Sequence, residues 1–347
     1  MLAALAVLLP SPGLALDFVA VTFNAGTTTA LAHNADQTDG YTSSEANISD
    51  DWYGNGLAWQ EAVDAAQIYF SGLQPEIVAF QEIFYSGECP GIPTQYHPGF
   101  VCETWQPGDP TVAEIVLGPD YQVACNVGKP DKCLAVRKDF GLFQGCSGNL
   151  CLDGLDGVNV PGCGGGSRVG RGVVDLANGG TLTLVNVHGT SGIADADQDC
   201  RVAQFSQIFE DFDGEPAANG ALNLVMADFN VDPARWIGFD PSANLLEFHA
   251  PVAGGGVFAY VSEVGFEAPP TYFDLFNLDH ILSDEFTGSC TTPGIGAEPP
   301  VWGTVYFDHV PIVCAVPEPG SGSMLLAGIG WLVWTGARRR FARRRSH

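Results

Sequence analysis

Basic residues are scarce in this chain of 347 residues. Lys and Arg total 14 against 40 Asp and Glu, and six of the 14 are arginines within the last ten positions. The rest of the chain therefore has eight basic residues against 40 acidic ones, a formal charge of −32. A body this acidic repels polyanions at long range, which argues against stable sequence-specific binding of nucleic acid. Turnover of a phosphate ester at a site that holds a cation stays possible.

The residue spacings typical of zinc sites are also missing. No two cysteines have Cys-x2-Cys spacing, and no two histidines are separated by three to five residues. The ten cysteines are scattered and even in number, which predicts disulfide bonds formed in an oxidising compartment. Among the many possible connectivities we predict the pairs Cys89–Cys102, Cys125–Cys133, Cys146–Cys151, Cys163–Cys200 and Cys290–Cys314.

The composition disfavours both a disordered chain and a helical bundle. The chain is 46% hydrophobic and long enough to bury a sizeable core. Its 43 glycines and 23 prolines make up about a fifth of the residues, and they accompany Thr- and Val-rich runs. This combination indicates many short strands joined by turns. No internal repeat is visible.

The N-terminal residues 1–15 resemble an export signal. Leu2 to Leu9 form an apolar run, and Gly13-Leu14-Ala15 places small residues at the −3 and −1 positions of a cleavage site. The usual basic segment before the apolar run is missing, which leaves an upstream start codon open. A buried first strand is the alternative interpretation.

The C-terminal residues 316–347 resemble the PEP-CTERM sorting signal of Gram-negative bacteria. Val316-Pro317-Glu318-Pro319-Gly320 is followed by an apolar stretch at 324–334 and then by the arginine cluster. The resemblance implies export, processing by sorting machinery, and delivery to the bacterial cell surface, outer membrane or extracellular matrix. The apolar stretch is shorter than the roughly 20 residues of a stable span, so we expect transient membrane association. A single-span tail anchor and an amphipathic surface helix are the alternatives.

Between the two ends, apolar runs with β-branched residues alternate with two segments of helical spacing. The helices are predicted over 57–70 and 197–212, and a hairpin turns at Asn178-Gly179-Gly180. Segments 86–111 and 140–168 are rich in Gly, Pro and Cys, and we interpret them as surface insertions held by disulfides. The predicted strands cover 18–23, 77–80, 121–125, 133–136, 173–176, 182–187, 222–226, 280–282, 305–307 and 312–314.

Polar side chains able to bind a metal or move a proton stand at the ends of these apolar strands. Taken singly each is weak evidence, because Asn and Asp after a strand are commonly turn formers and Glu there is commonly solvated. Ligands nevertheless converge at strand ends in layered α/β architectures, so the repeated occurrence points to a site. The residues are Asn24, Glu82, His188, Asp228 with Asn230, Asp279, and Asp308 with His309.

The order of these residues resembles the endonuclease/exonuclease/phosphatase superfamily. Over about residues 17–315 the resemblance implies an α/β (α+β) fold, a four-layered sandwich of two packed, mostly antiparallel sheets flanked by helices. It also implies hydrolysis of phosphate esters with Mg²⁺, or with Mn²⁺ or Ca²⁺. The motifs are Thr22-Phe23-Asn24, Val78-Ala79-Phe80-Gln81-Glu82, Val185-Asn186-Val187-His188, Met226-Ala227-Asp228-Phe229-Asn230, Leu278-Asp279-His280-Ile281 and Phe307-Asp308-His309-Val310-Pro311.

The resemblance implies a role for each acidic or amide residue. Glu82 would be the principal metal ligand, with Asn24 beside it and Asp308 near the metal; such oxygen ligands suit Mg²⁺ or Ca²⁺. Asp228 and Asn230 would activate and orient the attacking water. The first motif departs from the family, because Gly26 stands where many members have a second polar ligand.

The histidines and two arginines complete the predicted site. Asp279 would hold His309, at the phosphate, in its useful tautomer. His188 matches the histidine of the deoxyribonuclease and sphingomyelinase branches, where it donates a proton or hydrogen bond. Arg168 and Arg171 are tentative phosphate ligands, with surface arginines in a disulfide-rich loop as the alternative.

Three functions remain after this reasoning. The leading one is an exported, metal-dependent phosphodiesterase, nuclease-like toward extracellular DNA or RNA. A sphingomyelinase-like phospholipid diesterase would need exposed aromatic side chains to enter a bilayer. The third is a catalytically silent surface or matrix protein on the same fold, against which the intact set of candidate catalytic residues argues. The aromatic candidates for bilayer entry are Trp105, Phe258, Tyr260 and Tyr272-Phe273.

Overall fold

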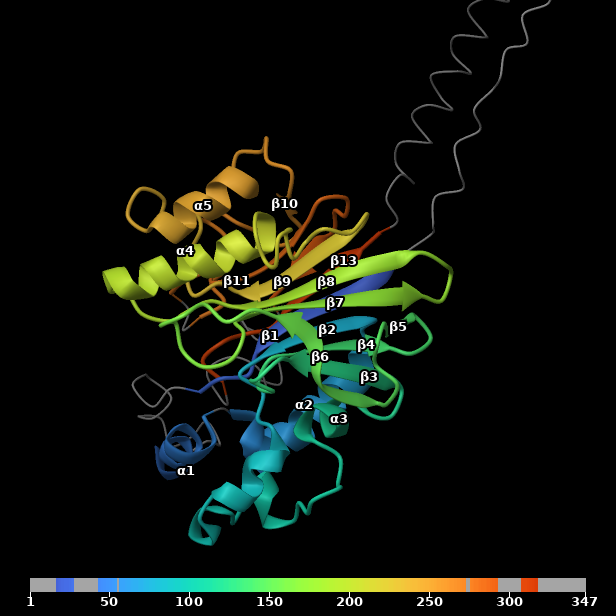
Figure 1. Ribbon diagram of the computed structural model, residues 1–347. Helices are drawn as coiled ribbons and strands as arrows, with labels where there is room; N and C mark the ends of the chain where they lie inside the picture. Colours follow the sequence, from blue (N-terminus) through green and yellow to red (C-terminus); the bar gives the residue numbers. More distant parts are fainter. Residues whose placement is uncertain (1–16, 28–42, 55, 273–274, 293–306, 318–347) are drawn as a thin grey trace, which may run out of the picture.

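The computed structural model describes residues 17–27, 43–54, 56–272, 275–292 and 307–317 (Figure 1). Its α-helices are α1 (Ser43–Ile48), α2 (Gln60–Leu73), α3 (Val112–Leu117), α4 (Asp195–Phe209) and α5 (Pro241–His249). Shorter helical turns cover Ser49–Tyr53, Gly56–Ala58, Ser86–Gly91, Thr94–Tyr96 and Val101–Glu103. The strands are β1 (Phe18–Asn24), β2 (Ile77–Gln81), β3 (Tyr121–Asn126), β4 (Cys133–Arg137), β5 (Gly141–Phe143), β6 (Leu150–Gly157), β7 (Val169–Leu176), β8 (Thr181–His188), β9 (Asn223–Asp228), β10 (Ala259–Tyr260), β11 (Asp279–Ser283), β12 (Ser289–Thr291) and β13 (Ile312–Val316).

The strands form one curled sheet that folds back on itself. The hydrogen-bonded order is β10-β11-β9-β8-β7-β6-β3-β4-β2-β1-β13-β12, with β5 pairing to β7. Strand β6 connects the two halves, because it pairs parallel with β3 and antiparallel with β7. The pairs β1–β2 and β8–β9 are also parallel, and the other described pairs are antiparallel.

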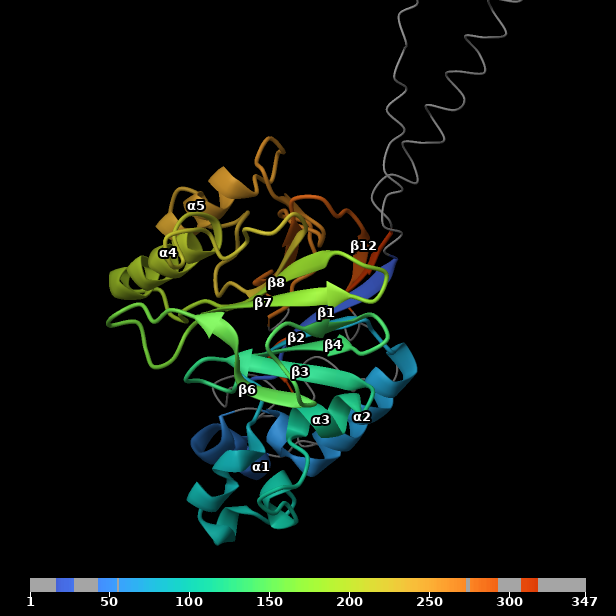
Figure 2. The same ribbon diagram turned by 45° about the vertical axis from the view of Figure 1, so that its right-hand side comes forward.

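Three hydrophobic clusters divide the molecule into four layers. The central cluster lies between the two sheet halves and includes Ala20, Leu134, Leu184 and Met226. A second cluster packs the outer face of β1 and β2 against α2 and α3, and a third packs β8 and β9 against α4 and α5. The helices therefore lie on opposite sides of the double sheet (Figure 2). This is the predicted four-layered α/β sandwich with mostly antiparallel strands.

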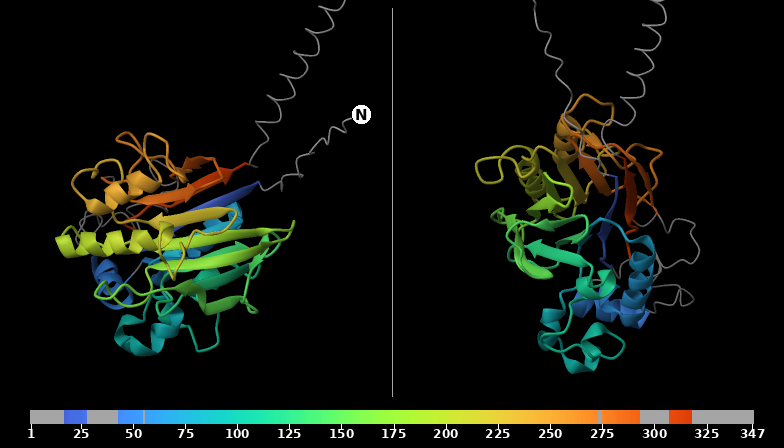
Figure 3. Two further views of the ribbon diagram at one scale, coloured as in Figure 1. Left: turned by 45° about the horizontal axis from the view of Figure 1, so that its top comes forward. Right: turned by 90° about the vertical axis from the view of Figure 1, so that its right-hand side faces the viewer.

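The first and last strands of the body are neighbours. In the antiparallel pairing of β1 with β13, Phe18 lies opposite Val316, so both ends of the described body emerge at one edge (Figure 3). Asn24 ends β1 at the far edge. With about 3.3 Å per strand residue, the two edges are roughly 20 Å apart along β1.

Several predicted elements shift, and the two predicted surface insertions contribute more to the fold than expected. The helix predicted over 57–70 begins at Gln60, because Trp59 is extended and forms an isolated bridge with Phe100. Segment 140–168 is not only a surface insertion, since it supplies β5 and β6. Phe307 is not in a strand, and the remainder of the strand predicted over 305–307 lies outside the described residues. The sequence analysis also did not identify α3 and α5.

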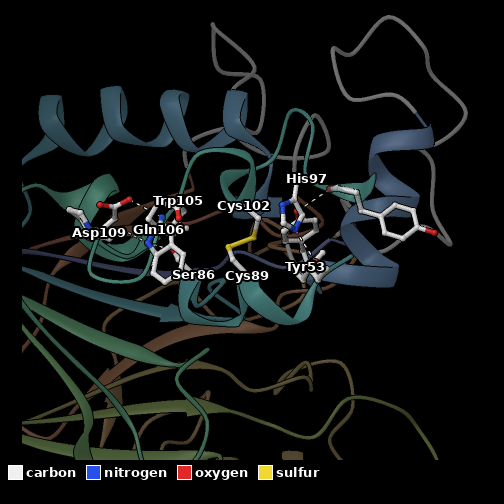
Figure 4. The surroundings of a disulfide bond; sticks show 12 residues. Tyr53, Ser86, Cys89, His97, Cys102, Trp105, Gln106 and Asp109 are labelled. Atoms are coloured by element: carbon white, nitrogen blue, oxygen red, sulfur yellow. Dashed lines mark hydrogen bonds between the residues drawn. A yellow bond between two sulfur atoms is a disulfide. The ribbon is translucent and has the colours of Figure 1, made fainter. Parts of the chain in front are cut away.

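All five predicted disulfides are confirmed. The Cys89–Cys102 bond holds segment 86–111, where Tyr53, His97 and Trp105 surround it (Figure 4). This segment is more than a surface insertion, because both of its cysteines are buried in the cluster that covers α2. The oxidised cysteines agree with an exported protein.

The disulfide between β12 and β13 is expected to stabilise the strand that follows His309. The bond joins Cys290 and Cys314, which are 24 residues apart in the sequence and directly opposite each other in the pairing of β12 with β13. Replacing Cys290 and Cys314 together by Ser should lower the free energy of unfolding by roughly 3 kcal/mol, because the unfolded chain regains loop entropy. Chemical denaturation of the oxidised proteins measures this loss. The matched control replaces Cys146 and Cys151, separated by 5 residues, and should lose about 1 kcal/mol less; a larger loss in this control would contradict the entropic account.

No helix within the described residues is long and apolar enough to span a membrane. The predicted export signal at 1–15 and the predicted membrane contact at 324–334 both lie outside the described residues.

Candidate active site

The alternation of side chains along five strands places polar groups at one edge of the central layer. On β1, Val21 and Phe23 pack toward the helices, whereas Ala20 faces the other sheet half. Because strand side chains alternate with a period of two, Asn24 continues the inward-facing set that contains Ala20. The same parity holds on four other strands, where Gln81, His188 and Asp228 end β2, β8 and β9 on the inward side. Asp279 begins the antiparallel strand β11 at the same edge, two residues before the inward-facing Ile281.

A buried hydrogen-bond network separates this edge from the apolar core. Nε2 of Gln81 donates to Oδ1 of Asn186 at 2.7 Å and also reaches Thr22 Oγ1 at 3.3 Å. Nδ2 of Asn186 donates to the backbone oxygen of Phe80 at 3.0 Å. These contacts tie β1, β2 and β8 together below the site. The sequence analysis missed the role of Gln81 and Asn186, although their inward parity was a usable signal.

Asp228 lies at the centre of the site. Its Oδ2 accepts from Asn24 Nδ2 at 2.7 Å and from Asn230 Nδ2 at 3.2 Å, and its Oδ1 accepts from the Asn230 backbone N–H at 2.7 Å. Burial raises the pKa of Asp228 to about 7; His309 opposes this shift and Asp279 adds to it. Asn230 holds its position with a left-handed φ of 52°, which is costly for a residue with a side chain.

Asp279 and His309 form a buried pair beside Asp228. Nδ1 of His309 donates to Oδ2 of Asp279 at 2.7 Å, and His309 Nε2 lies 3.8 Å from Oδ2 of Asp228. Burial alone would lower the pKa of His309, but Asp279 and then Asp228 raise it to about 10. His309 is therefore an imidazolium near neutral pH, with its Nε2–H directed toward the centre of the site.

Thr271, which the sequence analysis did not identify, connects the elements that carry this pair. Its Oγ1 accepts from the backbone N–H groups of Leu278 at 3.0 Å and Asp279 at 3.1 Å. Its backbone oxygen accepts from Val310 N–H at 2.8 Å. The adjacent Tyr272 ring packs against His309, with centroids 4.7 Å apart. Thr271 thus sets the position of β11 relative to the segment that carries His309.

Replacing Thr271 by Val should lower kcat roughly tenfold, because the loss of the acceptor oxygen lets Asp279 shift relative to His309. The apparent affinity for the metal should stay the same. Thr271→Ser keeps the hydroxyl and should restore most of the activity. The measurement is kcat and Mg²⁺ dependence on protein shown to be folded by circular dichroism. If Thr271→Ser were as impaired as Thr271→Val, the hydroxyl would not be the positioning group.

Glu82, Asn24 and Asp308 surround Gly26. A Cβ added to Gly26 would overlap Oε2 of Glu82 and lie 3.0 Å from Oδ1 of Asn24. The backbone N–H of Asp308 contacts the Gly26 oxygen at 3.4 Å. Glu82 itself has a left-handed φ of 54°, which turns its carboxylate back toward this glycine. The missing side chain at Gly26, a departure from the family pattern, leaves room for the Glu82 carboxylate.

These three residues fit a divalent cation. Burial, followed by the negative charges of Asp308 and Asp228, raises the pKa of Glu82 to about 8. Carboxylates held this close repel one another, and a hard cation with oxygen ligands relieves that repulsion. Asp228, Asp279 and His309 also offer ligand atoms within 4.8 Å of one another. In that second group, Asp228 Oδ2 and Asp279 Oδ2 already accept hydrogen bonds from Asn24, Asn230 and His309. We therefore take Glu82, Asn24 and Asp308 as the candidate cation ligands.

His188 lies between the two groups. Its Nε2 is 3.5 Å from Oε1 of Glu82 and 3.8 Å from Oδ2 of Asp228. Burial and the charges of Arg168 and Lys132 hold the pKa of His188 well below its usual value, so it is neutral. As a neutral ring, it can form a hydrogen bond with a phosphate or a leaving oxygen without adding charge to the site.

The two candidate phosphate-binding arginines differ in their position relative to the site. Arg168 lies next to the site, since its backbone oxygen accepts from the His188 N–H at 2.9 Å. Arg171 is not brought to the site. It pairs with Asp156 at 2.9 Å and Glu215 at 3.6 Å, and lies over the Phe212 ring. Side chains alternate between the two faces of a strand, so Arg171 points to the same face of β7 as Val169, which faces the α4 layer. Arg171 therefore points away from the site.

Comparisons with known proteins bear on the tail and on the fold. The chain carries a PEP-CTERM protein-sorting motif at residues 315–340. No curated protein matches the chain. The sorting motif and the five disulfides agree with an exported protein.

Several solved structures are similar over most of the chain at low identity. An endonuclease/exonuclease/phosphatase family protein from Bacteroides thetaiotaomicron is 14% identical, with 88% of this chain and 96% of that chain covered and a TM-score of 0.48. A humanized D. rerio TDP2 is 12% identical, with coverages of 86% and 98% and a TM-score of 0.48. The human Nocturnin catalytic domain is also 12% identical, with coverages of 86% and 93% and a TM-score of 0.46.

Proposed function

We propose that this chain is an exported, divalent-cation-dependent phosphoesterase that hydrolyses the phosphodiesters of extracellular DNA or RNA. The observation that carries the proposal is the meeting of two unlike groups around Asp228. On one side, Glu82, Asn24 and Asp308 offer oxygen ligands around Gly26. On the other side, the Asp279–His309 pair offers a buried imidazolium. A phosphodiester needs both, since its anionic oxygens must be neutralised before a water can attack.

The side chains of the site would have different chemical roles. A divalent cation, Mg²⁺ or alternatively Mn²⁺ or Ca²⁺, bound by Glu82, Asn24 and Asp308 would neutralise charge that develops on the phosphate oxygens. The Nε2–H of His309 donates a hydrogen bond to the same phosphate group, and Asp279 keeps that imidazolium oriented.

Activation of the attacking water falls to Asp228, and stabilisation of the leaving oxygen falls to His188. Asp228, with a pKa of about 7, is matched to taking a proton from the attacking water near neutral pH, and Asn230 orients it. The neutral His188 donates its hydrogen bond to the leaving oxygen.

The phospholipid alternative has less support. It needs exposed aromatic side chains, but of the predicted candidates Phe258 is 8% exposed in the third cluster and Tyr260 packs on His280. The aromatic side chains that are strongly exposed in the described residues, Phe239, Phe248 and Phe266, were not among those candidates. Trp105 is engaged through its Nε1, which donates to the Pro110 oxygen, and Tyr272 packs on His309. Phe273 lies outside the described residues. The position of the site also suits a sorted protein, since it opens at the edge opposite the body's two ends.

The test is hydrolysis of bis-p-nitrophenyl phosphate by the oxidised protein. We expect turnover with Mg²⁺, Mn²⁺ or Ca²⁺ and none with EDTA. Turnover that survives EDTA would refute the cation dependence. No turnover with any of the three cations would refute the phosphodiesterase proposal and favour a silent matrix protein.

A further inference from the structure

The eight basic residues of the body fall into two groups by their distance from the site. Five of them are held by partners away from the site: Arg137 by Glu76 and Asp139, Lys138 by Pro119 and Asn149, Arg171 by Asp156, Arg201 by Asp240, and Arg235 by Asp232. The other three are Lys129, Lys132 and Arg168. They converge at one place, on the side of the site where His188 and Glu82 lie.

Two loops bring the three cations together. One joins β3 to β4 and carries both lysines, and the other precedes β7 and carries Arg168. The loops are fastened to each other, because Asn126 Nδ2 donates to the Ser167 oxygen at 3.2 Å and the Ser167 N–H donates to the Val127 oxygen at 3.2 Å. They approach so closely that a Cβ on Gly166 would overlap Cβ of Lys129.

The lysine loop is also attached to the residue after the proposed metal ligand Glu82. The Ile83 N–H donates to the Asp131 backbone oxygen at 2.9 Å. A cavity of about 230 Å³ opens at this junction, lined by Glu82, Lys129, Asp131, Tyr53, Tyr85 and Glu88. Of the three cations, Lys129 borders this space, which reaches the proposed metal ligand Glu82.

The charges of this cluster are only partly balanced. Asp131 pairs with both lysines, at 2.6 Å to Lys132 and 3.0 Å to Lys129. The Lys132 side chain is fully buried, whereas that of Lys129 is 38% exposed. Nε of Arg168 is buried and has no hydrogen-bond partner within the described part of the chain. Glu88, on the cavity wall, is the further carboxylate that faces Lys129.

We propose that Lys129 and Arg168, supported by the buried charge of Lys132, bind a second, non-scissile phosphate of the substrate. This proposal rests on the proposed function and specifies its substrate class, a polyphosphodiester such as a single strand of nucleic acid. The reason is selective placement: in a body of charge −32, three of the eight basic residues lie together beside the reacting centre.

The test compares substrates with one phosphate and with many. Lys129→Gln should lower kcat/KM for a single-stranded DNA dodecamer at least tenfold more than for bis-p-nitrophenyl phosphate. The slope of log(kcat/KM) for the dodecamer against log[salt] should become shallower by about 0.7, the value for one lost phosphate contact on a single strand. Lys129→Arg should retain the preference, and Lys138→Gln, on the far loop, should leave both substrates unchanged.

Each unexpected result would overturn a different proposal. Equal losses on both substrates, or no loss on the dodecamer, would overturn the second phosphate site while leaving the proposed function in place. Faster turnover of sphingomyelin or phosphatidylcholine vesicles than of the dodecamer, unaffected by Lys129→Gln, would overturn the assignment to a polyphosphodiester. If no cation supports turnover of bis-p-nitrophenyl phosphate, the proposed function fails. In that case, fluorescence anisotropy of the labelled dodecamer at low salt decides the site alone, since Lys129→Gln must weaken binding at least tenfold.

Discussion

Replacing Glu82 by Gln should lower kcat/KM by roughly a thousandfold at limiting Mg²⁺, because the variant loses several kcal/mol of charge stabilisation. The amide keeps the shape of the carboxylate but lacks the charge that attracts a cation. Glu82 is the residue whose side chain occupies the space left by Gly26, and it faces Asp308 and Asp228. Removing its charge also relieves their mutual repulsion, so the free energy of unfolding should not fall.

Mg²⁺ titration of the activity is the measurement that distinguishes this role. Much higher Mg²⁺ should partly restore turnover in Glu82→Gln, since the remaining ligands Asn24 and Asp308 still offer oxygen atoms. Glu61→Gln, an exposed carboxylate on α2, is the matched control and should behave as wild type. Near-normal turnover of Glu82→Gln at limiting metal would show that the cation is held elsewhere.

The second large effect concerns Asp279 and His309. His309→Ala should lower kcat/KM roughly a thousandfold, within the range for a lost acid–base group. Asp279→Asn should lower it roughly a hundredfold, because the amide no longer orients and stabilises the imidazolium. The double variant should be little worse than His309→Ala alone, since both residues act through one imidazole. Metal affinity should hardly change in any of the three proteins.

Wild type, the two single variants and the double variant form a double-mutant cycle, which tests whether the two losses of activity are additive. Measuring kcat/KM and Mg²⁺ dependence for wild type, both single variants and the double variant gives the coupling energy directly. Losses that multiply fully would mean that Asp279 and His309 work independently, in spite of the 2.7 Å contact between them.

The same pair gives a pH dependence of stability. The pKa of His309 is about 10 in the folded protein, against an unfolded value of about 6.5. A group whose pKa is raised on folding stabilises the protein fully below its unfolded pKa, and this contribution is lost as the pH rises through the folded pKa. Wild type should therefore lose stability between about pH 6.5 and pH 10. The loss should be smaller in Asp279→Asn, as urea denaturation across this range can show.

Local patterns predicted much of the fold. Apolar runs with β-branched residues marked most of the longer strands, because such side chains suit a pleated, buried surface. Helices shifted by two or three residues at their ends, since contacts such as the Trp59–Phe100 bridge are long-range. The five disulfides were predictable because most of the paired cysteines are close in sequence, and neighbours in the chain meet at low entropic cost.

The sequence by itself determined which residue types stand at the strand ends, and therefore that Asn24, Glu82, Asp228, Asp279 and His309 are candidates for one site. It could not determine which of them touch, because the contact of Asn24 with Asp228 joins residues 204 positions apart. Only the tertiary structure separated Arg168 from Arg171, since the orientation of a strand residue depends on register and not on its neighbours in the chain. It also revealed Thr271 and the lysines at 129 and 132, whose functions come from backbone contacts and from the packing of two distant loops. No local pattern encodes those contacts, because they exist only once the two halves of the sheet have closed on each other.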